Sequence, residues 1–97
     1  MDSRIVKVIV KGDSMWPTWS DGSIVDFTEF NGQELKKSDL IAFFHPFKPK
    51  VICLKRIKEI RAEGIFVQGD NPDPLASEDS HNFGLIQPSA ITAYQES

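Results

Sequence analysis

The sequence predicts an all-β fold, either a small barrel or coiled sheets, and three observations support this. Six short runs are rich in β-branched and aromatic residues. Glycine, proline and asparagine signals for turns separate them. The one segment with room for a helical turn, Gln33–Lys37, is too short to change the fold class. The six runs are Ile5–Val10, Ile24–Phe27, Leu40–Phe44, Val51–Ile60, Ile65–Gln68 and Ala90–Tyr94.

The first two strands are expected on either side of a polar segment. Ile5–Val10 is a β-branched run that half alternates with lysines, and it ends at Gly12. Ser20–Ser23 has the composition of a turn, so the second strand is expected to begin at Ile24. Asn31-Gly32 then gives a strong signal for a tight turn.

The third and fourth strands are expected on either side of a proline-containing loop. Leu40–Phe44 is closed by His45-Pro46, and Pro49 follows shortly after. Two prolines cannot lie inside a central strand, because proline has no N–H to donate. The run from Val51 is the longest candidate, and a turn at Ala62–Gly64 leads it into the fifth strand.

A polar connection, Gly69–Asn82, precedes the last predicted strand. It shows no regular period. Its length is near the ~12–15 residue limit for connections without secondary structure, and such loops are often functional. Its many small hydrogen-bonding residues suit a loop that orients other side chains, although a solvated surface loop has the same composition.

The composition describes one domain, residues 1–97, and argues against several functions. Eleven Lys and Arg against 14 Asp and Glu give a net charge of −3, which counts against nucleic-acid binding. No run approaches the ~20 apolar residues of a spanning helix, so no integral membrane anchor is expected. A single cysteine and the lack of a signal-peptide core predict a cytoplasmic location. A zinc site of four Cys and His ligands is excluded, because Cys53, His45 and His81 are the only such residues and their spacing fits none. No metal or cofactor is expected.

The first candidate functional residue is Ser14, in the segment Gly12–Thr18. Gly12 permits a sharp turn directly after a strand, which places the Ser14 hydroxyl on an exposed corner with its own N–H free to donate. A nucleophile needs both access to a carbonyl and a nearby donor for the oxyanion. The alternative is a serine that only bonds its own turn, which is the commoner role in a Gly-Asp-Ser turn.

The second candidate is Lys55, in the longest predicted strand. With a period of two, Lys55 shares an otherwise apolar face with Val51, Cys53 and Ile57. Loss of hydration there penalises the ammonium and lowers the pKa of the lysine, so that a neutral amine can accept a proton from a serine. The alternative is a surface lysine that reaches water. Arg56 lies on the opposite face and stays protonated.

The order of these segments resembles that of the signal peptidase I-like Ser–Lys proteases. Gly-Asp-Ser-Met-x-Pro-Thr begins at residue 12, and Lys-Arg-Ile begins at residue 55. Gly-Asp-Asn-Pro begins at residue 69, and a Ser-x-Asp-Ser-x-x-x-Gly tail begins at residue 77. Leu35–Phe43, between the first two segments, fits as well, and the similarity extends from about residue 8 to residue 94.

The resemblance implies a fold and a set of roles. The fold is coiled β-sheets with a small SH3-like barrel, the catalytic core of signal peptidases and self-cleaving repressors. Ser14 is then the nucleophile and Lys55 the general base, while Ser77 hydrogen-bonds the lysine amine and Asp79 helps to hold its loop. An extended substrate would add as a strand to the strands that lead into Ser14 and Lys55. The residues assigned to oxyanion and substrate binding are Gly12, Asp13, Met15 and Cys53.

Three features depart from the pattern of the family. Gly12 stands where bacterial signal peptidases often have a serine or threonine as second oxyanion donor, so the Ser14 N–H is the one donor identified. His81 stands where the family has an arginine, so the arginine of the expected salt bridge is missing. The membrane anchors and large extra domain of signal peptidases have no counterpart in this sequence.

The residue that follows the candidate nucleophile has two possible roles. Met15 suits a core as well as a substrate pocket.

Within the family, the chain resembles the small subgroup of nickel-type superoxide dismutase maturation proteases. The similarity lies in His45-Pro46, the Lys-Pro that follows and Ile52–Ile57. The resemblance implies a cytosolic precursor protein as partner, whose N-terminal propeptide is removed to free a metal-binding N-terminus. The protease itself then needs no metal. The alternatives are a repressor-type self-cleaving peptidase domain and a non-catalytic module that binds a partner strand.

Overall fold

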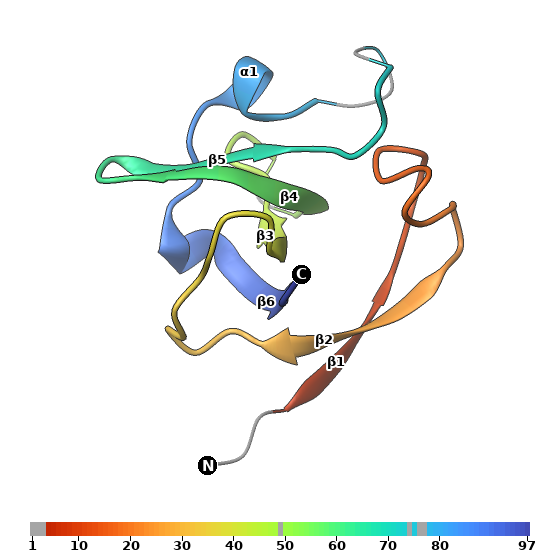
Figure 1. The fold of residues 1–97 in the computed structure, drawn as a ribbon, viewed down its shortest axis with the longest axis horizontal. Helices are drawn as coiled ribbons and strands as arrows, with labels where there is room; N and C mark the ends of the chain where they lie inside the picture. The colour runs from red at the N-terminus through yellow and green to blue at the C-terminus, as the bar shows by residue number, and fades with distance from the viewer. Residues whose placement is uncertain (1–3, 49, 74, 76–77) are drawn as a thin grey trace.

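Six antiparallel strands form a single twisted sheet in the computed structural model (Figure 1). The structure describes residues 4–48, 50–73, 75 and 78–97. Across the sheet the strands follow the order β1-β2-β6-β3-β4-β5. The elements in chain order are β1 (Ile5–Ile9), β2 (Ile24–Glu29), β3 (Leu40–Phe44), β4 (Ile52–Arg61), β5 (Gly64–Gln68), the helix α1 (Ser80–Phe83), the 3-10 turn η1 (Pro88–Ala90) and β6 (Ile91–Gln95).

All six predicted strands are present, and the all-β prediction is confirmed. The largest change in bounds is in β2, which continues to Glu29 because its last two residues pair with Tyr94 and Ala93 of β6. The predicted SH3-like barrel is not confirmed. Within the described part of the chain, β1 and β5 are the two edges of one open sheet.

Two connections differ from what the sequence suggested. Gln33–Lys37 forms no helical turn, and the backbone N–H of Lys36 instead donates to the carboxylate of Asp39 at 2.9 Å. The short helix α1 lies at the end of the polar connection that showed no period. Asp79 caps it through a hydrogen bond from His81 N–H at 2.8 Å, and a helix of one turn is too short to give a periodic pattern.

β3 is buried on both faces and separates two hydrophobic clusters. Successive side chains alternate in a strand, so Ile41 and Phe43 enter one cluster while Leu40 and Ala42 enter the other. The first cluster lies among β3, β4, β5, α1 and β6. The second joins β3 and β6 to β2 and to the turn after β1, and its buried members are Met15, Phe27, Leu40, Ala42 and Ala93.

The β1–β2 ribbon has one face toward the second cluster. β1 pairs with β2 along its whole length, from Ile5 opposite Thr28 to Ile9 opposite Ile24. Val6 packs against the cluster, whereas Ile5 and Ile9 are exposed. Among the described residues, no strand pairs with the outer edge of β1, so backbone N–H and C=O groups along that edge are available to a further strand.

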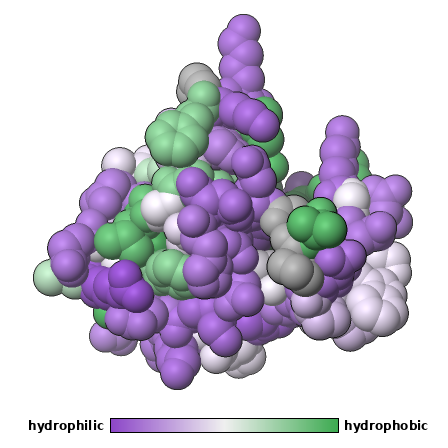
Figure 2. All heavy atoms as spheres, turned by 90° about the horizontal axis from the view of Figure 1, so that it is seen from above, coloured by the Kyte–Doolittle hydropathy of each residue, from purple (hydrophilic) through white to green (hydrophobic). Residues whose placement is uncertain are grey.

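Several large hydrophobic side chains are exposed. On the face seen in Figure 2, apolar patches lie separated among mostly hydrophilic side chains. Phe47 is 72% exposed, at the turn between β3 and β4, and Leu75 is 91% exposed. In the described ranges, no helix is long and apolar enough to cross a membrane.

Candidate active site

Ser14 lies in a tight turn that follows β1. Gly12 opens the turn with φ +81°, a left-handed conformation that favours glycine, and its N–H donates to the Asp21 carboxylate at 2.7 Å. The N–H of Trp16 closes the turn onto the carbonyl of Asp13 at 3.1 Å. Ser14 is half-buried at the mouth of a groove, and within the part of the chain that the structure describes its N–H has no hydrogen-bond acceptor.

Gly12→Ala is expected to lower the free energy of unfolding by about 1 kcal/mol and to reduce any activity that depends on Ser14. An added Cβ meets no atom within 4 Å, so the cost is backbone strain at φ +81° rather than a clash. Gly32→Ala is the matched control, because Gly32 has φ +92° and equally open surroundings but lies in another connection. Urea unfolding should show similar losses of stability for both variants. Equal activity of the two variants would contradict a role for Gly12 in placing Ser14.

The segment after β5 holds the turn that carries Ser14, and Figure 1 shows the two segments side by side. The backbone N–H of Asn71 donates to the Ser14 carbonyl at 2.9 Å, and its side-chain amide donates to the Asp13 carbonyl at 2.7 Å. The sequence indicated that this connection orients other side chains, but it did not single out Asn71. Asn71 therefore fixes the position of the candidate nucleophile from a distant part of the chain.

Asp70 connects the same turn to β4. Its carboxylate accepts two hydrogen bonds from the Arg56 guanidinium, at 2.8 and 2.7 Å, and a third from the Thr18 hydroxyl. Arg56 also donates to the carbonyl of Ser38 at 2.8 Å. Burial alone would raise the pKa of Asp70, but the hydrogen bonds from Arg56 and Thr18 outweigh it, and the net shift is downward. An ionised Asp70 thus ties the turn to the strand that carries Lys55.

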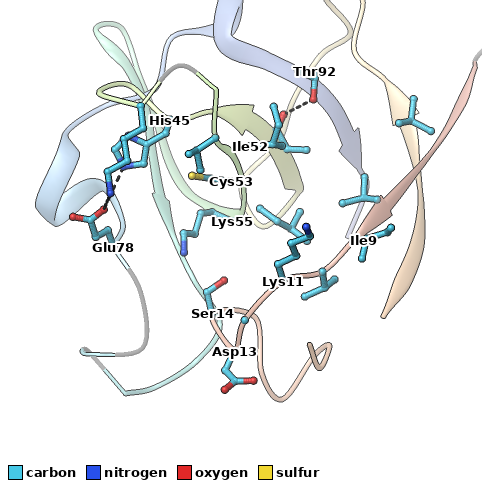
Figure 3. Close-up of a pocket in the computed structure, with 18 of the residues that line it drawn as sticks. Ile9, Lys11, Asp13, Ser14, His45, Ile52, Cys53, Lys55, Glu78 and Thr92 are labelled. Atoms are coloured by element: carbon cyan, nitrogen blue, oxygen red, sulfur yellow. Dashed lines mark hydrogen bonds and ion pairs between the residues drawn. The ribbon is translucent and has the colours of Figure 1, made fainter. Parts of the chain in front are cut away.

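Lys55 is buried in β4, on the face that the strand period predicts. Only 4% of the residue is exposed, and the neighbouring same-face residue Ile57 is in the core. Burial lowers the pKa of Lys55, while electrostatic interactions with Cys53, Asp79 and Glu78 act in the opposite direction. Figure 3 shows the amine end of Lys55 directed toward Ser14. A lysine with a lowered pKa in this position can act as a base toward the serine hydroxyl.

Ser14 and Lys55 line one groove with a volume of about 790 Å³. One side is the β1 strand and the turn after it, and the other is the first half of β4 with the residues before it. β5 pairs with β4 from Arg56 onward, so the β4 edge before Arg56 has no strand partner on that side among the described residues. The groove therefore lies between two available strand edges, which suits an extended peptide.

The other predicted substrate-binding residues divide into two groups. Gly12, Asp13 and Cys53 line the groove, and burial raises the pKa of the Cys53 thiol, which disfavours a thiolate nucleophile there. Met15 is wrongly predicted as a substrate contact. It is fully buried in the second cluster, because the turn directs its side chain into the core while Ser14 faces the groove.

Asp79 and His81 occupy the N-terminal end of α1. Asp79 caps the helix, and its carboxylate also contacts His81 Nδ1 at 2.9 Å. Asp79 also raises the pKa of Lys55 by its charge. Ser77, the predicted partner of the lysine amine, lies outside the described residues.

No family model matches the chain, and no curated protein matches it. Within the described ranges, no three His, Cys, Asp or Glu side chains are grouped as metal ligands. The groove itself and the sequence motifs that form it are therefore the features from which a function can be inferred.

Proposed function

We propose that the protein is a serine endopeptidase in which Ser14 is the nucleophile and Lys55 the general base. The observation that carries the proposal is a buried lysine amine directed toward a turn serine inside a groove between two strand edges (Figure 3). A surface lysine that reaches water, the alternative interpretation of Lys55, is inconsistent with its 4% exposure.

The proposed reaction is acyl transfer in two steps. Neutral Lys55 Nζ accepts the hydroxyl proton as Ser14 Oγ attacks the scissile carbonyl carbon. The tetrahedral intermediate collapses, the C–N bond breaks, and the leaving amine takes the proton from the lysine ammonium. Water then attacks the ester and gives a proton to the same amine. The bond between the acyl carbon and Ser14 Oγ breaks, the lysine ammonium returns the proton to Oγ, and the acid is released. The lysine returns to its neutral form in each cycle.

The backbone N–H of Ser14 is the proposed oxyanion donor. It has no acceptor among the described residues, whereas the N–H of Gly12 is bonded to Asp21 and is occupied. Preorganised N–H donors act on the charge that develops in the transition state. The bonds from Asn71 to the carbonyls of Asp13 and Ser14 hold this peptide segment in place.

The proposed substrate is an extended segment of a precursor protein. The available edges of β1 and of the first half of β4 offer backbone groups to such a segment on both sides. By its sequence resemblance, the proposed precursor is nickel superoxide dismutase, and the cut would free its metal-binding N-terminus. The proposed location of this step is the cytoplasm.

The test is incubation of the purified protein with this precursor, followed by mass measurement of the products. A single cut ahead of the metal-binding segment, lost in Ser14→Ala, is the expected result. A Ser14→Ala variant that binds the precursor without cutting it supports the same site. Binding without cleavage by the unsubstituted protein would instead favour a strand-binding module, which is the main alternative.

The rate of cleavage is expected to rise with pH until Lys55 is deprotonated. Only the neutral amine can accept the serine proton, and burial lowers the pKa of Lys55, so the rising limb should lie below the ordinary range of lysine. The measurement is kcat/KM of the precursor from pH 5 to pH 10. A rate that is flat across this range would contradict Lys55 as the base.

A further inference from the structure

His45 lines the groove, although the sequence indicated only a loop at this position. It follows β3 directly and is 5% exposed, although it lines the groove together with Lys55. Its Nδ1 accepts the backbone N–H of Phe47 at 3.0 Å, so the neutral ring carries its proton on Nε2. That nitrogen lies 3.3 Å from Glu78 Oε1 and donates to it.

The two partners of this contact come from different parts of the chain. His45 begins the turn between β3 and β4, and Glu78 belongs to the segment that leads into α1. The His45 ring also packs edge-on against Phe83 of α1, with centroids 5.0 Å apart, and Lys48 Nζ lies 3.9 Å from the same Glu78 oxygen. Figure 3 shows this contact at the side of the groove where Cys53 and Lys55 lie.

We propose that His45 is a positioning residue, whose Nε2–H bond to Glu78 holds Glu78 and Asp79, directly before α1, against the β3–β4 turn and so keeps water from Lys55. The inference rests on the proposed function, because it concerns the same base. It gives His45 a part in the reaction without contact with the substrate.

The charge balance around Lys55 makes the effect measurable. Burial is the largest influence that lowers its pKa, and entry of water would remove part of that influence. Glu78 acts in the opposite direction, because its negative charge stabilises the ammonium. The titratable and charged groups around this part of the groove are Cys53 on β4, His45 and Lys48 in the turn after β3, Glu78 and Asp79 before α1, and Lys7, Lys11 and Asp13 on the side of β1.

A matched pair of variants separates the two bonds of the His45 ring. In His45→Asn the amide oxygen can still accept from Phe47, but no donor reaches Glu78. In His45→Gln the longer amide can still donate to Glu78. We expect His45→Asn to raise the pKa of Lys55 by about one unit, and His45→Gln to raise it less. The measurement is an NMR titration of isotope-labelled lysine side chains, with Lys55 assigned by its loss in Lys55→Met.

Glu78 variants give a second test that does not depend on the packing of His45. Glu78→Gln keeps the hydrogen-bond acceptor and removes the charge, so the pKa of Lys55 should fall. Glu78→Ala removes both, so the pKa should lie higher than in Glu78→Gln. An unchanged pKa in His45→Asn, or equal values in Glu78→Gln and Glu78→Ala, would overturn the inference.

Cleavage assays of the same variants distinguish this inference from the proposed function. If His45→Asn cuts the precursor about tenfold more slowly at neutral pH and recovers at alkaline pH, the proposed function and the role of His45 are both supported. A rise of one pKa unit lowers the neutral fraction of the Lys55 amine tenfold. A uniform loss at every pH would contradict the positioning role. If the unsubstituted protein cuts nothing while the NMR shifts appear as expected, the proposed function fails and the role of His45 in shielding the amine stands.

Discussion

Lys55→Met is expected to abolish cleavage of the precursor and to leave a protein at least as stable as the original. Methionine keeps the length of the side chain but cannot accept a proton, and loss of a general base that acts with a serine nucleophile lowers kcat by at least about a thousandfold. The buried amine is costly to desolvate, so an apolar side chain of similar volume should raise the free energy of unfolding by about 1 kcal/mol at neutral pH.

The gain in stability should depend on pH with a definite sign. Because burial lowers the pKa of Lys55, the unfolded chain binds more protons at pH values between the lowered pKa and the ordinary lysine value. The stability of the original protein therefore rises with pH across this window. The advantage of Lys55→Met should be largest below the lowered pKa and should shrink as the pH approaches the ordinary value, which urea unfolding at several pH values can measure.

Lys58→Met is the matched control for this variant. Lys58 lies on β4 as well, but it is exposed. It should leave both the cleavage rate and the pH dependence of stability unchanged. Near-full cleavage by Lys55→Met would exclude the lysine as the base. A large loss of stability would mean instead that the interactions of the amine outweigh the cost of its burial.

Asp70→Ala is expected to cost about 2 kcal/mol of stability and most of the activity. The ion pair of Asp70 with Arg56 is intermediate in burial. Exposed ion pairs contribute about 0–1 kcal/mol, whereas disruption of a buried pair costs about 3–5 kcal/mol. The side chains of Arg56 and Asp70 are 25% and 15% exposed. Removing the carboxylate also leaves Thr18 without its acceptor and separates the turn of Ser14 from β4. A shift of about 1 Å in a reacting group can cost about a hundredfold in rate.

The loss in Asp70→Ala should diminish in acid. Hydrogen bonds hold the pKa of Asp70 below its usual value, so its contribution is complete above the unfolded pKa and is lost as the pH falls through the folded one. The control is Glu59→Ala, which removes a solvent-exposed pair with Arg61 at 2.7 Å and should change neither stability nor activity measurably. Equal behaviour of the two variants would show that Asp70 does not hold the turn.

The strands and the two central site residues could be predicted from the sequence because they depend on local patterns. Alternation along Val51–Ile60 is enough to place Lys55 on a buried face, and Gly12 is enough to turn the chain at Ser14. The order of the motifs then indicated that the two belong together. The structure places them in one groove.

The residues that the sequence missed act across long separations. Asp70 bonds Thr18 over 52 positions, and Asn71 bonds Asp13 over 58, so no local pattern could reveal either contact. Met15 was misassigned for a related reason. Neighbours in a turn can point in opposite directions, and only the packing of β2, β3 and β6 shows that Met15 fills the core. His45 is buried by α1, a helix too short to predict.

The available edge of β1 also has a consequence for how the protein behaves at high concentration. An unpaired strand edge can template association with a second copy of the same strand, and the exposed Ile5 and Ile9 flank it. Lys7 stands between them with its side chain 70% exposed, and a charge in this position opposes edge-to-edge aggregation. The edge that suits the groove to an extended peptide is thus also a surface on which a second copy can pair, and beside it lies Lys7, which forms an ion pair with Asp26 at 2.7 Å.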